Sequence, residues 1–156
     1  GQQVHQRRRD QVQCERGNRT PFQSRIELSL AVTLYAATNG ADVSQQAVYG
    51  YPINCWDVSR ITTFARLFEA RTNFNADISG WQVSQVTNMD RMFANCTSFN
   101  QPLDSWDMSR VTSANEMFEN ARSFNQPLSS WNLQSLGSAT GIFRGATSFS
   151  QDLCDW

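Results

Sequence analysis

Large aromatic residues recur along the chain at a fixed interval of 25 residues. Positions 25 residues apart form a column, and three such columns hold all five Trp and eight of the ten Phe. Their members are Trp56, Trp81, Trp106, Trp131 and Trp156; Phe68, Phe93, Phe118 and Phe143; and Phe74, Phe99, Phe124 and Phe149. Self-similarity at such a period, without insertion or deletion, indicates coils that stack on their neighbours. The pattern therefore predicts a four-coil repeat solenoid over residues 56–156.

Within each coil, the spacing of apolar residues changes along the repeat. Ile61, Phe64 and Phe68 lie at i, i+3 and i+7, which places them on one helical face. Residues 87–90 have the spacing of a helix-capping box. The Asn-Gln-Pro-Leu segments at 100–103 and 125–128 are typical of a turn that leads into a short extended segment. We therefore expect an α/β solenoid whose coils contain a short helical turn and a short strand paired in parallel with its neighbours.

The segment before the first full coil has a different pattern and is expected to cap the stack. Ser24 is a candidate N-cap for a helix that runs to about Ala37 and covers the first coil with its apolar residues. Residues 38–46 are predicted to be a turn-rich connection. The repeat columns begin with a half coil at Tyr49, which lies in the column of Phe74. We thus predict three parts: an extended basic arm (1–21), a helical cap with a half coil (22–55), and the four-coil stack (56–156).

Charge and composition exclude several classes of chemistry. All 13 basic residues are Arg, and the only His is His5. Lysine-based Schiff bases, Walker-type nucleotide sites and multi-histidine sites are therefore excluded. Residues 1–25 carry 6 − 2 = +4 charges and the remainder 7 − 12 = −5. This near-neutral sum argues against a nucleic-acid binder, and the uneven split is typical of an interaction tail. We expect no enzyme activity, no cofactor and no bound metal.

No segment of the sequence is apolar enough to insert into a membrane. The longest such stretch, residues 28–37, is about half of the ~20 residues that a spanning helix needs. The chain begins at Gly1 without Met, which suggests a leader that has already been removed.

Several repeat motifs resemble those of a known family. They are Trp-Asp-Val-Ser-Arg-Ile-Thr (56–62), its echoes at 81–89 and 106–112, and the Met-Phe and Ser-Phe-Asn-Gln-Pro-Leu pairings at 92–103 and 117–128. Over residues 22–156 the chain is similar to BspA-type leucine-rich-repeat surface proteins. This resemblance implies a leucine-rich-repeat-like fold on an extracellular or cell-surface protein, with adhesion as the usual role. Coil four departs from the pattern at Leu133, Gln134, Leu136 and Gly137.

Three columns allow both a functional and a structural interpretation. The Trp column could form a ladder for a glycan, but repeated large aromatics more often fill a continuous core. Asn75, Asn100 and Asn125 could bind a ligand, although side-chain amides also satisfy turn backbone groups. Asp57 and Asp107 share a column and could serve a glycosidase, yet they follow the repeat. We favour the structural interpretation in each case.

The four cysteines allow three pairings. Cys14 with Cys55 is the best intrachain candidate, because it ties the arm to the first coil. Cys154 could instead meet Cys14 of another copy, and Cys96 is a candidate free buried thiol, since two coils separate it from Cys154. Asn18 and Asn95 begin glycosylation triplets, which arise often by chance.

The two ends of the chain suggest assembly. The last coil shows no capping segment, so Phe149, Leu153 and Trp156 are expected to face outward, while Arg7, Arg8 and Arg9 lie in the arm at the other end. We predict a non-catalytic surface protein that polymerises head to tail through the arm and the last coil. The alternative is a monomeric adhesion module that binds a host protein or a glycan.

Overall fold

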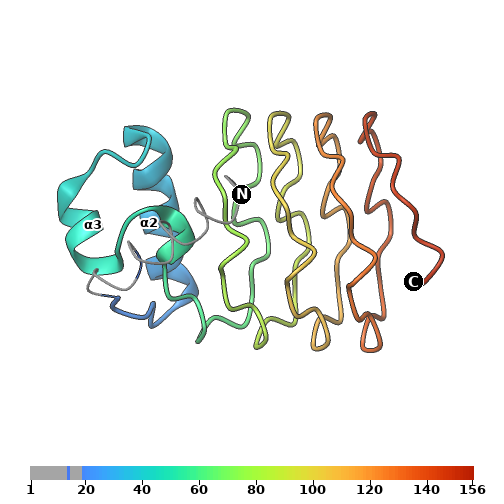
Figure 1. Ribbon diagram of the computed structural model, residues 1–156, viewed down its shortest axis with the longest axis horizontal. Helices are drawn as coiled ribbons and strands as arrows, with labels where there is room; N and C mark the ends of the chain where they lie inside the picture. The colour runs from blue at the N-terminus through green and yellow to red at the C-terminus, as the bar shows by residue number, and fades with distance from the viewer. Residues whose placement is uncertain (1–13, 15–18) are drawn as a thin grey trace, which may run out of the picture.

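The computed structural model describes Cys14 and residues 19–156. Two α-helices, α2 (Arg25–Thr38) and α3 (Val43–Tyr49), precede a short 3-10 helix, η1 (Ile53–Cys55). The rest of the chain forms four successive coils that lie side by side, with the helices at one end of the row (Figure 1). We number them coil 1 (residues 56–80), coil 2 (81–105), coil 3 (106–130) and coil 4 (131–155). Helix α2 thus lies at the coil 1 end of the row (Figure 1), in the segment where the sequence predicts one capping helix.

Helix α2 begins and ends with ordinary capping contacts. The Ser24 side chain accepts a hydrogen bond from the backbone N–H of Glu27, which satisfies one of the free donors of the first turn. At the other end Asn39 adopts the left-handed conformation, and its N–H bonds to the carbonyl of Tyr35. Leu28, Ala31 and Val32 are buried against coil 1, so these residues set the orientation of the helix.

Helix α3 was not predicted, because the turn-rich segment 38–46 conceals its start. Asp42 caps the helix by accepting a hydrogen bond from the N–H of Gln45. The Gln45 side chain is buried and donates to the carbonyl of Ala31 at 2.7 Å, which fixes α3 against α2. The polar residues of this segment therefore make a cap and an interhelical contact, which their composition alone does not distinguish from a loop.

The prediction of an α/β, leucine-rich-repeat-like solenoid is wrong. Among residues 19–156 no strand or sheet is formed, and the coils contain turns instead of helices. Parallel pairing is reduced to one isolated bridge per junction: Thr63 with Asn88, Asn88 with Ser113, and Ser113 with Ser138. The capping box expected at 87–90 is likewise absent, since the Asn88 side chain accepts from the N–H of Asp90 in a turn.

Rows of peptide groups aligned along the stack replace the expected helical turns. The N–H groups of Phe64, Arg66, Phe68 and Ala70 donate to carbonyls of coil 2 at 2.8–3.0 Å. A helix would direct these groups to carbonyls four residues earlier in the same segment. Here Arg66 and Ala70 have positive φ angles of 59° and 62°, so alternate N–H groups point to the next coil. Coils 2 and 3 repeat both features.

The second of these left-handed columns contains Ala70, Asn95, Asn120 and Gly145. Gly145 has φ of 72°, and a Cβ there would lie 2.2 Å from the side-chain oxygen of Asn120. We expect Gly145→Ala to lower the free energy of unfolding by about 1–2 kcal/mol, because an L side chain is strained in this conformation. Gly137→Ala is the matched control, since its Cβ would meet only the Thr112 carbonyl at 3.5 Å. Equal urea midpoints for the two variants would contradict this assignment.

The core is a set of aromatic stacks inside the coils. Phe93 stacks on Phe68 and Phe118 of the neighbouring coils with ring centroids 5.7 and 5.5 Å apart. It also lies 4.2 Å from Phe99 within its own coil. Each coil therefore contributes two Phe rings that contact the next coil, and this continuity holds the coils in one register.

Candidate functional site

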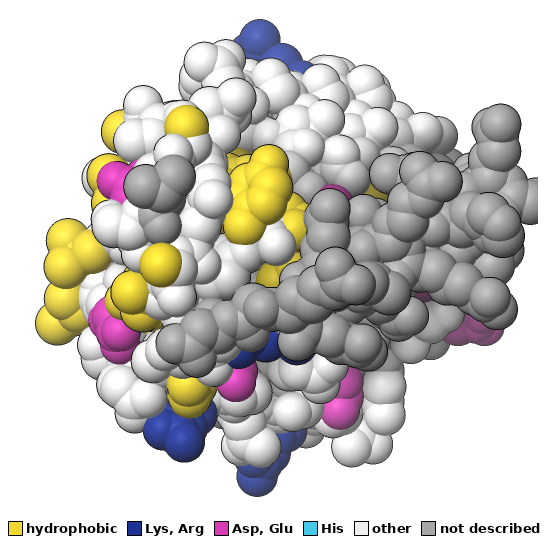
Figure 2. Space-filling model, turned by 60° about the vertical axis from the view of Figure 1, so that its left-hand side comes forward, with side chains coloured by type: hydrophobic (Ala, Val, Ile, Leu, Met, Phe, Trp, Pro, Cys, Tyr) yellow, Lys and Arg dark blue, Asp and Glu magenta, His cyan; other side chains and the backbone are white. Residues whose placement is uncertain are grey.

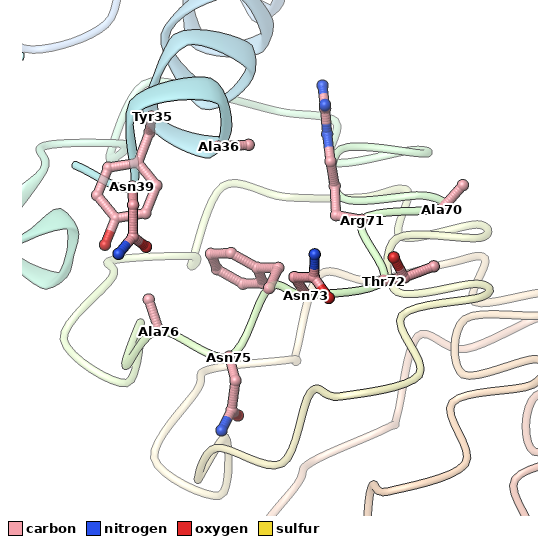
Figure 3. Close-up of a pocket in the computed structure, with 10 residues that line it drawn as sticks. Tyr35, Ala36, Asn39, Ala70, Arg71, Thr72, Asn73, Asn75 and Ala76 are labelled. Atoms are coloured by element: carbon pink, nitrogen blue, oxygen red, sulfur yellow. The ribbon is translucent and has the colours of Figure 1, made fainter. Parts of the chain in front are cut away.

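A pocket lies where the end of α2 meets coil 1. Its cavity volume is about 470 Å³, within the range of ligand sites in proteins. One wall of the pocket is formed by the last turns of α2, and the other by residues 70–76 of coil 1 (Figure 3). The lining residues are Tyr35, Ala36, Asn39, Ala70, Arg71, Thr72, Asn73, Phe74, Asn75 and Ala76.

Two aromatic rings and one cation give the pocket its character. Tyr35 packs edge-on against Trp56, and Phe74 stacks on Phe68 at 4.2 Å, so both rings are held in place. Burial raises the pKa of the Tyr35 hydroxyl, which keeps it protonated and able to donate. Arg71 donates to the hydroxyl of Thr33 at 2.9 Å, which anchors its guanidinium beside α2. This pocket was not predicted from the sequence, because α3, η1 and the first half of coil 1 separate its two parts along the chain.

The Trp column is part of the core. Trp56, Trp81, Trp106 and Trp131 are 3–4% exposed, and Trp156 is 38% exposed. Each later indole donates to the carbonyl of the residue 28 positions earlier, as Trp81 does to Ile53 at 2.8 Å. A buried ring whose N–H is already bonded cannot stack on a sugar, so the structural interpretation of this column holds for the first four Trp residues.

The Asn column also links the coils. The side-chain oxygens of Asn75, Asn100 and Asn125 accept from the N–H of the residue 25 positions later, at 2.8–3.0 Å. The amide of Gln101 donates to the Asn75 carbonyl, and Gln126 repeats this contact one coil later. Side chains thus make the bonds that backbone strands were expected to make. Pro102 has no N–H to donate, which is one reason that no ladder forms here.

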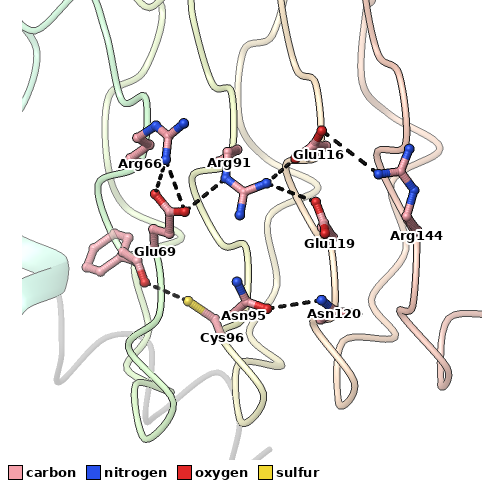
Figure 4. A network of polar contacts seen from close by, with 10 residues as sticks. Arg66, Glu69, Arg91, Asn95, Cys96, Glu116, Glu119, Asn120 and Arg144 are labelled. Atoms are coloured by element: carbon pink, nitrogen blue, oxygen red, sulfur yellow. Dashed lines mark hydrogen bonds and ion pairs between the residues drawn. The ribbon is translucent and has the colours of Figure 1, made fainter.

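A network of ion pairs crosses all four coils on one face (Figure 4). Arg91 is its centre: its side chain is 21% exposed and contacts Glu69 at 2.9 Å and Glu119 at 2.9 Å. The complete chain of pairs is Arg66–Glu69, Glu69–Arg91, Arg91–Glu116, Arg91–Glu119 and Glu116–Arg144. A sequence signal for this network was present: the side-chain charge changes sign within the column of Arg66, Arg91 and Glu116 and within that of Glu69, Glu119 and Arg144.

The electrostatics of this network are those of stabilised ion pairs. The hydrogen bond from Arg91 to Glu69 is the main cause that raises the pKa of Arg91. Burial alone would raise the pKa of Glu69, but hydrogen bonds and charge from Arg91 and Arg66 together lower it. Both shifts favour the charged forms of Arg91 and Glu69. The network therefore acts as an electrostatic link between neighbouring coils.

Comparison with known proteins identifies the family of the chain. Residues 37–156, more than half of the chain, match the family described as "Mycoplasma protein of unknown function, DUF285". The chain belongs to the DUF285 family. No curated protein and no solved structure matches the chain. The resemblance to BspA-type surface proteins stays a prediction.

The DUF285 match covers α3, η1 and the four coils but only the last residues of α2. The pocket therefore joins a part inside the DUF285 segment, Asn39 and residues 70–76, to Tyr35 and Ala36 before it. No helix in the described part of this DUF285 chain is long and apolar enough to span a membrane. Residues 19–156 and Cys14 likewise contain no cluster of three or more His, Cys, Asp or Glu able to hold a metal ion.

The cysteines of the DUF285 chain occupy three different environments. Cys14 and Cys55 form a disulfide with Cα atoms 5.2 Å apart, the pairing favoured from the sequence. Cys96 is a buried free thiol that donates to the carbonyl of Phe68, and burial raises its pKa to about 12. Cys154 is free and exposed, and a hydrogen bond with Asp152 raises its pKa. Neither free thiol is activated as a nucleophile.

The structure places only some of the residues predicted for assembly and glycosylation. Arg7, Arg8, Arg9 and Asn18 lie outside the described residues. Phe149 and Leu153 are partly buried in coil 4, beside the exposed Trp156. Asn95 is half-buried in the left-handed conformation, and its side-chain oxygen accepts from Asn120 at 3.0 Å. Of the described residues among them, Asn95, Phe149, Leu153 and Trp156, none lines the pocket.

Proposed function

We propose that this chain is a non-catalytic structural repeat protein of the cell surface that self-associates. The observation that carries the proposal is the outward face of α2. Ile26 and Leu30 are 73% and 67% exposed, and Leu34 is 39% exposed. These residues lie at i, i+4 and i+8 and form one apolar row, the α2 row, while the opposite face of the helix is buried in the core. The end of the molecule that carries α2 bears uncovered hydrophobic side chains (Figure 2).

A surface helix normally carries charged side chains on its solvent face. Arg25 and Glu27 are the only charged residues of α2, and both are engaged within the chain. Arg25 donates to the Ala65 carbonyl at 2.7 Å, and Glu27 accepts from the N–H of Gln23 and the hydroxyl of Tyr49. The α2 row is therefore an apolar surface without charge, of the kind that marks an interaction site.

The partner that fits the α2 row best is the same row of a second copy. In an antiparallel pair with Leu30 at a twofold axis, Ile26 of each copy faces Leu34 of the other, so every large side chain meets an apolar one. The segment 1–18 is a poor alternative, since its only aliphatic side chains are Val4 and Val12. A membrane surface is also disfavoured, because an interfacial helix carries Lys or Arg beside its apolar face.

The coil stack and the disulfide support the structural part of the proposal. The polar side chains of the Asn, Trp and Arg/Glu columns are used in contacts between coils, which makes the stack a rigid unit. A disulfide between Cys14 and Cys55 is typical of proteins that reside in an oxidising, extracellular compartment. The head-to-tail contact through the arm and coil 4 stays a prediction, since the arginines of the arm lie outside the described residues.

Sedimentation velocity across a concentration series tests self-association. Because the row is small, we expect a weak dimer with a dissociation constant on the order of 10–100 µM. Leu30→Glu should leave a monomer, because it places two like charges at the twofold axis. Gln82→Glu, which adds the same charge at an exposed site on coil 2, should dimerise like the wild type. A wild type that stays monomeric, or a Leu30→Glu variant that still dimerises, would sink the proposal.

Cysteine cross-linking tests the antiparallel geometry in a Cys154→Ser background, which removes the exposed free thiol. Leu30→Cys should form a disulfide-linked dimer on mild oxidation. Ile26→Cys and Leu34→Cys should each cross-link poorly alone but efficiently when mixed, because the pair brings those two positions together. Efficient cross-linking of Ile26→Cys with itself would instead indicate a parallel pair and overturn the geometry.

A further inference from the structure

The pocket between α2 and coil 1 is where coil 1 departs from its own repeat. Coils 2–4 carry Cys or Ala in the column of Arg71, Ser in the column of Asn73, and Gln in the column of Ala76. All three departures line the pocket. Two of them add polar hydrogen-bonding groups, and the third replaces a long side chain by a methyl group and opens space. The repeat thus provides an internal reference for what a purely structural coil contains.

The cation of the pocket has no acidic partner. Arg71 contacts the neutral hydroxyl of Thr33, and none of the ion pairs found among the described residues includes it. None of the ten residues that line the pocket is acidic. Its guanidinium can therefore offer several N–H donors, with its charge, to a carboxylate on a ligand.

The remaining lining suits a hydroxyl-rich ring. Asn39, Thr72 and Asn73 contribute exposed amides and a hydroxyl to the lining, and these groups can both donate and accept. The rings of Tyr35 and Phe74 and the methyl group of Ala76 supply apolar surface to the same lining. A sugar presents hydroxyl groups at its edge and C–H groups on its face, which matches a lining that combines polar and apolar groups. A peptide carboxylate would leave most of these amides unused.

We propose that this pocket binds an acidic saccharide, a sugar that bears a carboxylate. Arg71 binds the carboxylate, Asn39 and Asn73 bind ring hydroxyl groups, and the half-buried Tyr35 ring contacts the apolar face of the sugar. The members of the α2 row do not line the pocket, so this proposal and self-association are tested by different variants. It gives the adhesion alternative a defined location, which the buried Trp column does not provide.

Saturation-transfer NMR with the full chain tests the proposal with three probes: D-glucuronate, D-glucose and succinate. We expect glucuronate to bind with a dissociation constant on the order of 1 mM. Glucose lacks the carboxylate and succinate lacks the ring, so each should bind at least roughly tenfold more weakly. No glucuronate signal at about 20 mM, or equal signals from glucose or succinate, would overturn the assignment.

Variants taken from the repeat itself place the ligand in the pocket. Ala76→Gln and Asn73→Ser install the residues of coils 2–4, so they should fold normally and weaken glucuronate binding, the first by filling the cavity. Arg71→Gln should weaken binding roughly tenfold. Arg122→Gln, the same change at an exposed site on coil 3, is the matched control and should bind like the wild type. Binding that survives both Ala76→Gln and Arg71→Gln would show that the sugar binds elsewhere and refute the proposal.

Discussion

Replacing Phe93 by Ala is expected to lower the free energy of unfolding by about 3–5 kcal/mol. The Phe93 ring is fully buried and stacks on three other Phe rings, those of Phe68, Phe99 and Phe118. Its removal leaves a cavity at the centre of the stack, and each coil is stable only through its neighbours. The loss therefore falls on both junctions of coil 2. Urea denaturation followed by circular dichroism measures it.

Phe143→Ala is the control, because this residue occupies the same column in coil 4. Phe143 is only partly buried, and it stacks on Phe118 of coil 3 at 5.5 Å and on Phe149 of its own coil at 4.0 Å. Less area is withdrawn from water, so the expected loss is at most about 2 kcal/mol. Equal losses for the two variants would contradict a core whose contribution grows with the number of neighbouring coils.

The period of the sequence predicted the number of coils, their order and the core columns, because apolar residues must be buried wherever coils stack. The same information did not reveal the backbone. Ile61, Phe64 and Phe68 have helical spacing, yet turns that bury the same three residues satisfy the pattern equally well. Hydrophobic spacing reports which side chains face inward and does not specify how the backbone between them is hydrogen-bonded.

One signal for the true backbone was present in the left-handed columns. Asn95, Asn120 and Gly145 occupy one of them, and Asn and Gly are the residues that most readily adopt positive φ. Arg66 and Arg91 in the other column give no such signal, because their conformation is imposed by the bonds to the next coil. Tertiary contacts therefore override the local backbone preference at Arg66 and Arg91.

The pocket could have been sought in the sequence by reading the columns for departures as well as for agreement. Arg71, Asn73 and Ala76 break three columns within six residues. Their neighbour in space, Tyr35, lies on a helix outside the repeat. A departure from the repeat can be found without a structure, whereas the surface that it faces cannot, because the docking of α2 depends on how Leu28, Ala31 and Val32 pack.

Removing the disulfide between Cys14 and Cys55 is expected to lower the free energy of unfolding by about 4 kcal/mol. The bond closes a loop over a sequence separation of 41 residues, and that figure follows from the chain entropy which the bond removes from the unfolded state. The closed loop includes α2 and α3, so the unfolded cap gains the most freedom when the bond is lost.

The double variant Cys14→Ala/Cys55→Ala measures this cost, with Cys154→Ala as a control that removes only an exposed free thiol. The double variant should show the lower urea midpoint, and dithiothreitol should lower that of the wild type to the same value. The double variant itself should not respond to the reductant. Phe22 packs against Tyr49 and Trp56, and the Phe22 N–H bonds to the carbonyl of Asp57, so the entry to the cap keeps non-covalent anchors. We therefore expect the coils to stay folded without the bond, and a collapse of the whole transition would show that the stack depends on its cap.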